Sequence, residues 1–554
     1  MDFSALRRRT TDLLQSLPQS LPTVNMSSVG IPNALKSPSH VMRGSWEKID
    51  VPPIKRSSHS VDVISGKAYI FGGEVRPREP VDNAMHVVNL PLSLSASADY
   101  YTVKAVPAKT YEPAPAEATT VREETKGDNA EEGEAATGGK GKERDLSDVS
   151  LGSPEELKGK GKEKEIAGPQ MGDVPTARVG HATAVLGNRI LLFGGRGGSD
   201  MAPLEEAGRV WVFDTRTNSW SYLDPSPPAV GAVARFPAAR SYHCAVATDK
   251  PNQFPTGGPK RAESWAEWAV GDSKKVGTPQ APIVGNVAAE AVDEEDAGYG
   301  TFFIHGGCLA DGERTNDFWA FNVRTRVWAE LPGAPGPARG GTAICISKSR
   351  LFRFGGFDGT TELGGQIDFV HLEVETFDDG VATGEVGVTA RGGWQAIAQG
   401  RPALTGEIPI DEATAAQEWP GGRSVLGFEA VTVGGGREYL LLAMGERDAS
   451  SEGHAGAGRF WDDVWLFQVP PLGMTAASVR DAMWQAMGHR TGEGKWSRVL
   501  MAPHDDDNSD EMPSPRGWIA TAPIGELEET AILVWGGLGE DNQRLGDGWI
   551  LRLA

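Results

Sequence analysis

Short runs of apolar residues, each ending at a glycine pair or near-pair, recur six times along the chain. They span residues 69–73, 190–195, 302–307, 351–356, 439–445 and 532–537. Apolar runs of this length, bounded by glycine and polar turn residues, predict β-strands. Because the same pattern returns at intervals, we expect repeated units that bury their apolar faces against one another.

The clearest unit begins at Arg178 and contains four short apolar or alternating segments. They lie near residues 182–186, 190–193, 210–213 and 220–223, and polar or glycine-containing turns separate them. Four consecutive short strands make one blade of a β-propeller. Six such units therefore predict an all-β protein, folded as a six-bladed β-propeller.

The last unit lacks a fourth strand, because the chain stops at residue 554 soon after the segment 549–553. Residues 44–49, which contain Trp46, have the form of the missing strand. We expect the last blade to combine both ends of the chain, which leaves no sheet edge exposed. The predicted organisation is a flexible tail, 1–43, followed by one propeller domain, 44–554. Two insertions interrupt it: a disordered acidic insertion at about 108–175 and a further one at about 249–298.

The repeat has a recognisable order: an arginine, a histidine three residues later, a glycine pair and a later tryptophan. Arg178, His181, Gly194-Gly195 and Trp220 show it in full. This pattern resembles the kelch-repeat β-propeller family, in the galactose oxidase/kelch group, over roughly residues 44–554. The histidine is replaced in the last three units, by Thr342, Leu426 and Ile519. The resemblance implies a kelch-type propeller and a non-catalytic role in protein binding.

The net charge and the cysteine content bear on the binding partners and on the cellular compartment. The 554 residues carry a formal net charge of −21, which argues against general binding to nucleic acid or anionic membranes. The three cysteines show no metal-binding spacing and suit a reducing compartment. We expect a cytoplasmic protein. The nucleus is left open, and so is a mitochondrial presequence, since the N-terminal segment contains Arg7-Arg8-Arg9 and few acids.

One arginine opens every unit, and these residues are the candidate partner-binding site. They are Arg56, Arg178, Arg240, Arg339, Arg423 and Arg516. In a six-bladed ring they would surround one mouth of the central channel, where guanidinium groups could bind carboxylates of a protein partner with an acidic motif. In the alternative interpretation each arginine is a structural part of the repeat, bound by backbone carbonyls or by a neighbouring acid.

Three histidines in equivalent positions raise the question of a metal site. They are His59, His181 and His243. Since each lies three residues after its own arginine, in a different unit, a core histidine in each blade explains them better. We therefore predict no metal, no cofactor and no catalytic residue.

Two groups of enzymes are related to the kelch family, and the sequence lacks the residue pattern of each. Specifier-type kelch proteins, which use iron, carry a Glu-x-x-x-Asp-x-x-x-His pattern; here His454 follows Glu446 at that spacing, but Ser450 replaces the aspartate. Galactose-oxidase-like enzymes need a Tyr–Cys pair with clustered ligands, and no such set is present. The favoured function is a protein-interaction module, scaffold or adaptor. A kelch-fold enzyme acting on a small molecule at the channel mouth remains the alternative.

Overall fold

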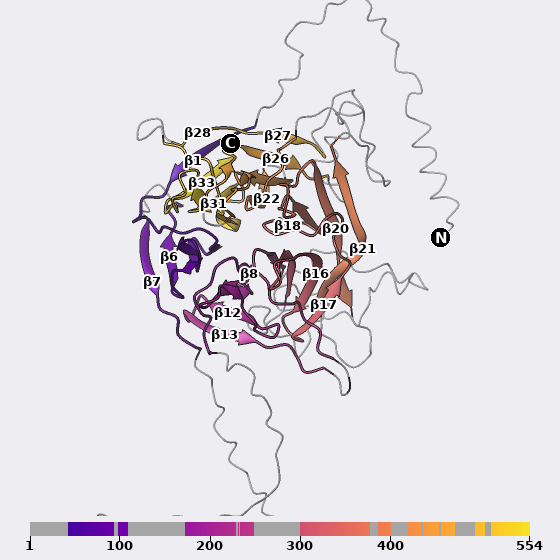
Figure 1. The fold of residues 1–554 in the computed structure, drawn as a ribbon. Coiled ribbons are helices and arrows are strands. Elements are labelled where there is room, and N and C mark those ends of the chain that lie inside the picture. Colours follow the sequence, from indigo (N-terminus) through magenta and orange to yellow (C-terminus); the bar gives the residue numbers. More distant parts are fainter. Residues whose placement is uncertain are drawn as a thin grey trace, which may run out of the picture.

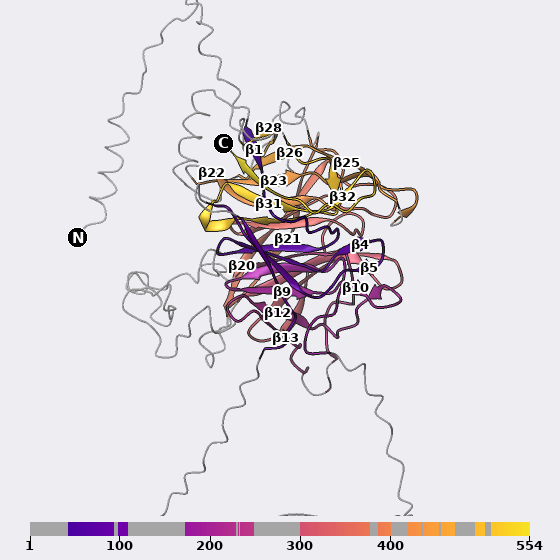
Figure 2. The same ribbon diagram turned by 90° about the vertical axis from the view of Figure 1, so that its left-hand side faces the viewer.

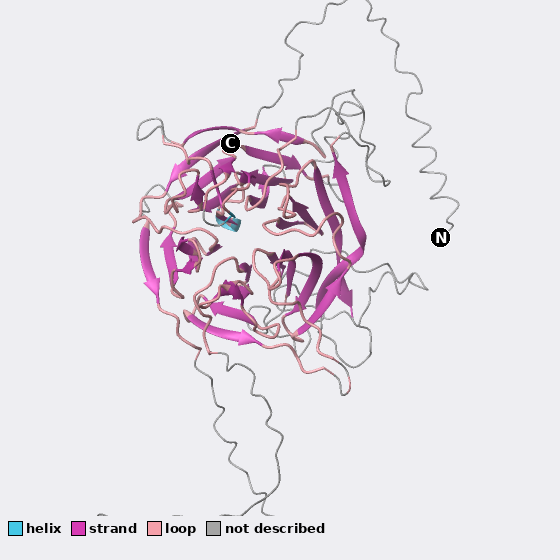
Figure 3. Cartoon of the chain, viewed as in Figure 1, coloured by secondary structure: helices cyan, strands magenta, loops and turns pink. Residues whose placement is uncertain are grey.

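The protein forms a ring of six β-sheets around a central axis, as Figure 1 shows, and the sequence runs around the ring in order. This computed structural model describes residues 42–92, 98–108, 172–228, 231, 233–248, 300–376, 386–399, 419–433, 436–453, 456–470, 494–504 and 511–553. Within these ranges the regular structure is almost entirely strand (Figure 3), with one short 3₁₀ helix, η4 (Gly525–Leu527). The predicted all-β, six-bladed propeller is confirmed.

Each blade is an antiparallel sheet whose first strand lies innermost. Blade one contains β2 (Ser60–Ile64), β3 (Lys67–Phe71), β6 (Met85–Asn89) and β7 (Asp99–Val103); blade two contains β8 (Ala182–Leu186), β9 (Arg189–Phe193), β12 (Val210–Asp214) and β13 (Ser219–Leu223). Blade three contains β14 (Cys244–Thr248), β15 (Thr301–Cys308), β16 (Arg314–Asn322) and β17 (Val327–Leu331); blade four contains β18 (Ala343–Ser347), β19 (Arg350–Phe354), β20 (Gln366–Thr376) and β21 (Val386–Ala398). Blade five contains β22 (Gly427–Val433), β23 (Arg437–Ala443), β26 (Val464–Gln468) and β27 (Trp496–Arg498).

Blade six is built from both ends of the chain. It contains β30 (Ala520–Pro523), β31 (Ala531–Trp535), β33 (Gly548–Leu553) and β1 (Arg43–Lys48). Strand β1 pairs antiparallel with β33, with Trp46 opposite Leu551, which is the closure expected from the sequence. A fifth strand, β28 (Leu500–Pro503), pairs parallel with β1 and was not predicted. Because β28 follows blade five in the chain, it links the two blades at the outer edge.

The core lies between the blades rather than in one centre. Six clusters of buried apolar residues each join two neighbouring blades. The late tryptophans occupy these interfaces: Trp220 lies 5.0 Å from Phe71 of the preceding blade, and Trp328 lies 5.3 Å from Phe193, measured between ring centroids. Each blade is therefore stabilised mainly by the apolar area that it buries against its neighbours.

Small two-stranded sheets gather on one face of the ring (Figure 2). They are β4 (Glu74–Arg76) with β5 (Glu79–Pro80), β10 (Arg196–Gly197) with β11 (Ala202–Pro203), β24 (Glu446–Asp448) with β25 (Arg459–Phe460), and β29 (Arg516–Gly517) with β32 (Leu538–Gly539). The loops after the glycine pairs and the loops that enter each inner strand meet on this face, which also holds the six arginines.

Most of both insertions lies outside the described residues, so their predicted disorder and the predicted division of the chain into 1–43 and 44–554 stay predictions. The second insertion does separate β14 from β15 within blade three, since β14 ends at Thr248 and β15 begins at Thr301. Among the helices that the structure describes, none is long and apolar enough to cross a membrane.

Candidate functional site at the channel mouth

A closed ring of backbone hydrogen bonds surrounds the channel on the arginine face. Six residues, each two positions after a blade's arginine, donate N–H to the carbonyl of the equivalent residue in the preceding blade, at 2.6–3.2 Å. We call this ring the channel mouth; its members are Ser58, Gly180, Tyr242, Gly341, Val425 and Trp518. A second ring of backbone hydrogen bonds lies beside it. The second glycine of each glycine pair, or Gly445 in blade five, donates its N–H to the backbone carbonyl of the arginine of the next blade, at 2.8–3.0 Å.

All six residues of the channel mouth have a positive φ, between 47° and 63°. This left-handed conformation costs roughly 1–2 kcal/mol for a residue with a Cβ, and only two of the six are glycine. At Gly180 a side chain would also collide with its neighbour, because a Cβ would lie 2.7 Å from the ring of Tyr242. The closed hydrogen-bond ring thus holds four non-glycine residues in a strained conformation.

Two of these residues, Tyr242 of blade three and Trp518 of blade six, meet across the channel. Their ring centroids are 5.3 Å apart and the rings are nearly perpendicular, a favourable edge-to-face contact. Because blades three and six lie on opposite sides of the ring, this aromatic pair spans the channel mouth. Both side chains are partly exposed to solvent.

Polar groups from other blades fix the aromatic pair. The Tyr242 hydroxyl hydrogen-bonds Ser58, and burial raises the pKa of Tyr242 to about 12. The guanidinium of Arg196 lies 5.3 Å from the centre of the Tyr242 ring. Trp518 hydrogen-bonds the Glu446 carboxyl; burial raises the pKa of Glu446 to about 7, although this bond lowers it. The mouth therefore presents two aromatic rings beside one fixed cation and one carboxyl group.

The six predicted arginines surround the mouth but lie beneath the surface. Their side chains are 0–7% exposed. Each donates from Nη1 to the carbonyl of the first residue of its own glycine pair, or of Met444 in blade five, at 2.8–3.3 Å. The structure thus brings all six to one face in equivalent positions, and contact with a partner stays a prediction.

In four blades the arginine also forms an ion pair, because its Nη1 and Nη2 both donate to one carboxylate. The pairs are Arg178 with Glu206, Arg240 with Asp317, Arg423 with Asp463 and Arg516 with Asp547, at 2.6–3.3 Å. Each carboxylate also accepts the indole N–H of a tryptophan, at 2.6–2.9 Å. Sequence reasoning missed these acids. In three blades the signal was an Asp-x-Trp triplet at the start of the third strand, 317–319, 463–465 and 547–549.

Blades one and four lack this carboxylate. In blade one, Arg56 Nη2 lies 3.0 Å from His86 Nε2, and that nitrogen lies 3.2 Å from an Asp82 oxygen. In blade four, Arg339 donates only to the carbonyls of Pro337 and Gly355, at 3.1 Å each, among the residues that the structure describes. The repeat is therefore chemically uneven, although its backbone is regular.

The three repeat histidines lie between blades, each against its preceding neighbour. His181 and His243 form edge-to-face contacts with Phe71 and Phe193, with centroids 5.4 and 5.6 Å apart. Burial lowers the pKa of His243 to about 3, so it is neutral at ordinary pH. His181 Nε2 lies 3.0 Å from Ser60 Oγ, whereas neither ring nitrogen of His59 has a partner among the described residues. The described part of the chain contains no group of three or more His, Cys, Asp or Glu placed to hold a metal ion.

Two carboxyl groups line the inner strands deeper in the ring. Burial raises the pKa of Asp62 to about 7, and a hydrogen bond with Thr183 lowers it in part. Burial also raises the pKa of Glu429 to about 8, opposed by the bond that it accepts from Thr521 at 2.7 Å and reinforced by Asp62. Unlike the acids beside the arginines, neither of these carboxyl groups has a cationic partner among the residues that the structure describes.

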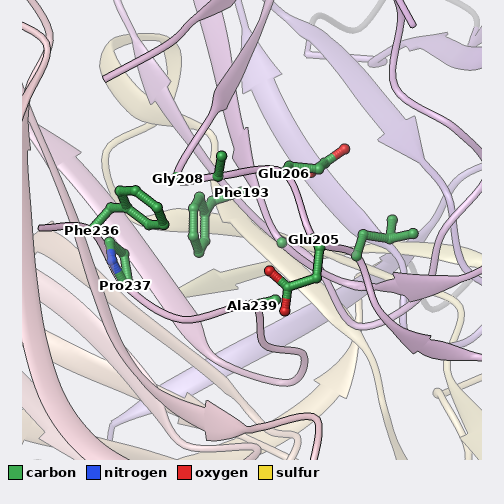
Figure 4. Close-up of a pocket in the computed structure, with 10 residues that line it drawn as sticks. Phe193, Glu205, Glu206, Gly208, Phe236, Pro237 and Ala239 are labelled. Carbon is green, nitrogen blue, oxygen red and sulfur yellow. The ribbon is translucent and has the colours of Figure 1, made fainter. Parts of the chain in front are cut away.

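A shallow pocket opens where blades two and three meet (Figure 4). The rings of Phe193 and Phe236 form its apolar side, and Glu205 and Glu206 bring carboxylates to it. Glu206 is already bound by Arg178. The pocket is therefore next to a completed arginine–carboxylate pair and offers an acidic rather than a basic lining.

Comparison with known proteins agrees with this architecture. A sequence model described as the KLHDC2/KLHL20/DRC7 Kelch-repeats domain matches residues 162–356. An arginine opens all six blades, and a glycine pair follows in every blade but the fifth. Residues 162–356 of this six-bladed β-propeller match kelch repeats. A curated relative, the N-(sulfonatooxy)prop-2-enimidothioate sulfolyase of Thlaspi arvense, is 24% identical over 392 residues, 67% of this chain and 92% of that protein. A solved structure, that of YjhT, aligns with 91% of this kelch chain and 99% of its own at 10% identity and a TM-score of 0.44.

Proposed function

We propose that this kelch propeller is a non-catalytic protein-interaction module whose partner binds over the channel mouth. The observation that carries the proposal is the pair Tyr242 and Trp518, which span the channel mouth in a strained backbone conformation. Residues in strained conformations cluster at binding and active sites. Tyr, Trp and Arg side chains near the centre of a surface are also the residues that dominate protein-binding energy.

The surroundings of the aromatic pair favour a protein partner over a small molecule. Arg196 supplies a positive charge beside the rings, and Glu446 supplies a carboxyl group whose pKa burial raises to about 7. The adjacent small sheets β4–β5 and β24–β25 extend this surface around the mouth. An apolar centre with a polar rim is the usual arrangement of a protein interface. The partner that we expect from the sequence carries an acidic motif, and it remains unnamed.

The test compares affinity capture from native cells by the intact chain and by two variants. The double variant Tyr242→Ala/Trp518→Ala removes the aromatic pair. The control Leu500→Ala removes an apolar side chain that is 56% exposed on β28, the outermost strand of blade six. We expect the double variant to lose specific partners and the control to keep them, with melting curves to show that both fold. Partners retained by a folded double variant would refute the proposal.

A catalytic role is the second candidate, because the Thlaspi arvense relative is named as a sulfolyase. The iron pattern suggested by the family resemblance is incomplete here, with Ser450 in place of aspartate. The test incubates the purified chain and a Ser450→Asp variant with ferrous iron and N-(sulfonatooxy)prop-2-enimidothioate. Product formation, or stoichiometric iron in the intact chain, would favour the enzyme. If only the variant binds iron, the natural chain has lost that chemistry.

A further inference from the structure

Among the described residues, blade four contains three buried arginines, Arg339, Arg350 and Arg353, whereas blades three and five contain one each, Arg240 and Arg423. Arg339 is 7% exposed and Arg353 is fully buried, and the negative charge of Asp368 acts on both. Asp368 is already used by Arg353, whose Nε and Nη2 donate to the same oxygen at 3.0 and 2.5 Å. A buried charge without a counter-charge is costly, so this arrangement needs an explanation.

The missing carboxylate can be located by strand register. In blade three, Asp317 comes just before Phe318, which pairs with His305, the last residue before the glycine pair. In blade four the corresponding residue is Gln366, just before Ile367, which pairs with Phe354. Gln366 donates its side-chain amide to Asp368. Thus neutral Gln366 stands where blade three has the acid that binds its arginine.

Solvent reaches one nitrogen of the Arg339 guanidinium, Nη2, although the residue is only 7% exposed. Its Nε and Nη1 are used by backbone carbonyls, and Nη2 has no hydrogen-bond partner among the described residues. Gly336 lies beside Nη2, and a side chain at this position would crowd it, because a Cβ would come within 2.9 Å. Burial and the positive charge of Arg353 lower the pKa of Arg339 to about 10, partly offset by Asp368 and Asp358. Arg339 is therefore charged at neutral pH, and no carboxylate of the described residues is hydrogen-bonded to it.

We propose that Arg339 is a carboxylate-binding position, at which an external carboxylate occupies the place that Asp317 fills in blade three. The ligand would be an aspartate or glutamate side chain, or the C-terminal carboxylate, of a bound peptide. Guanidinium–carboxylate pairs are charge-assisted and directional, which suits recognition of a single acidic group. This inference deepens the interaction role proposed above, and it singles out Arg339 among the six arginines.

The experiment measures binding of two small probes to the full chain by thermal shift at constant ionic strength. Aspartate blocked at both backbone ends presents a side-chain carboxylate, and N-acetylglycine presents a terminal one. We expect saturable stabilisation by at least one probe, and the stronger probe identifies the source of the ligand carboxylate. The variant Gln366→Asp should fill the position from within, raise the melting temperature without ligand and reduce the probe response at least fivefold.

A second variant, which removes the internal carboxylate of blade three, keeps the proposal testable if Gln366→Asp fails to fold. Asp317→Ala should open an equivalent position beside Arg240 and add a second, weaker response to the same probe. A folded Gln366→Asp variant that responds like the natural chain would overturn the proposal, and so would the absence of any response to both probes. Neither of these results would contradict the proposed role of Tyr242 and Trp518 in partner binding, which the capture experiment tests separately.

Discussion

Blades three and four have the same strands and the same arginine, but they compensate its charge differently. In blade three, Arg240 and Asp317 form two hydrogen bonds, at 2.6 and 2.8 Å, and Trp319 donates to the same carboxylate. In blade four the arginine has only carbonyl partners within the described chain, while the nearby acid binds another arginine. The backbone ring therefore tolerates the loss of a counter-charge that the repeat otherwise supplies.

The difference shows which part of the repeat is structural. In every blade the arginine Nη1 donates to the carbonyl of the first residue of the glycine pair, or of Met444 in blade five. Every blade also contributes one residue to the hydrogen-bond ring of the channel mouth. The carboxylate varies: it comes from Asp317 in blade three and from Glu206 in blade two, and no described residue supplies one as a hydrogen-bond partner of Arg339. The carbonyl contact thus holds the fold in every blade, and the second guanidinium edge is where individual blades can differ.

The largest loss of stability should come from opening the ring, because blades three and four both depend on the closed ring. Deletion of residues 1–50 removes β1, whose Trp46 is 3% exposed in the cluster between blades five and six. We expect the melting temperature to fall by about 10 °C or more, because blade six loses a strand and β28 loses its partner. Deletion of 1–40 keeps β1 and is the matched control. Equal melting of both chains would contradict closure by β1.

Breaking a completed pair should make another blade resemble blade four. In Asp463→Asn, Arg423 loses its counter-charge where the two side chains are 6% and 0% exposed. Removing one partner of a buried ion pair costs about 3–5 kcal/mol of unfolding free energy. Asp224→Asn, which breaks the pair of Arg209 with a carboxylate 47% exposed, should cost less than about 1 kcal/mol. Urea denaturation measures both, and similar losses would show that burial does not set the difference.

The pH dependence of stability separates paired from unpaired acids. Burial raises the pKa of Asp62 from 3.8 to about 7, so the folded chain holds a proton that the unfolded chain releases. This contribution to stability is complete below about pH 4 and is lost as the pH rises through 7. Asp62→Asn should flatten that fall by roughly 2 kcal/mol between pH 5 and pH 8. Parallel stability curves for the two proteins would contradict the assignment.

The acids beside arginine behave in the opposite way. Burial alone would raise the pKa of Asp317, but the hydrogen bond and charge of Arg240 outweigh it and hold the pKa below its usual value. Its contribution is present above pH 4 and is lost only as the pH falls further. Asp62→Asn should therefore leave the stability loss in strong acid unchanged, which provides an internal control within the same titration.

The smallest expected effect compares the two arginines directly. Arg240→Met leaves Asp317 without its guanidinium, whereas Arg339→Met removes a charge that has no carboxylate of its own. We expect Arg240→Met to cost about 1–2 kcal/mol more in unfolding free energy than Arg339→Met. Paired denaturation curves at the same pH measure the difference. An equal or larger loss in Arg339→Met would show that Arg339 already has full compensation in the free protein.

The sequence alone determined the fold, because the repeat is local and periodic. Apolar runs ending at glycine, such as 190–195, predicted strands, and six of them predicted the ring. The isolated strand at Trp46 predicted closure, because a four-stranded blade that lacks one strand has a single place for it. The repeat spacing also brought the six arginines to one face, although it could not show that their side chains are buried.

Only the tertiary structure decided what the candidate site contains. Tyr242 and Trp518 are 276 positions apart in the numbering, and they meet because opposite blades converge on the channel. The contrast between Arg240 and Arg339 likewise depends on strand register, which places Gln366 where another blade has Asp317. Strand patterns repeat along the chain and can be read from it, whereas contacts between blades depend on how the ring closes in space.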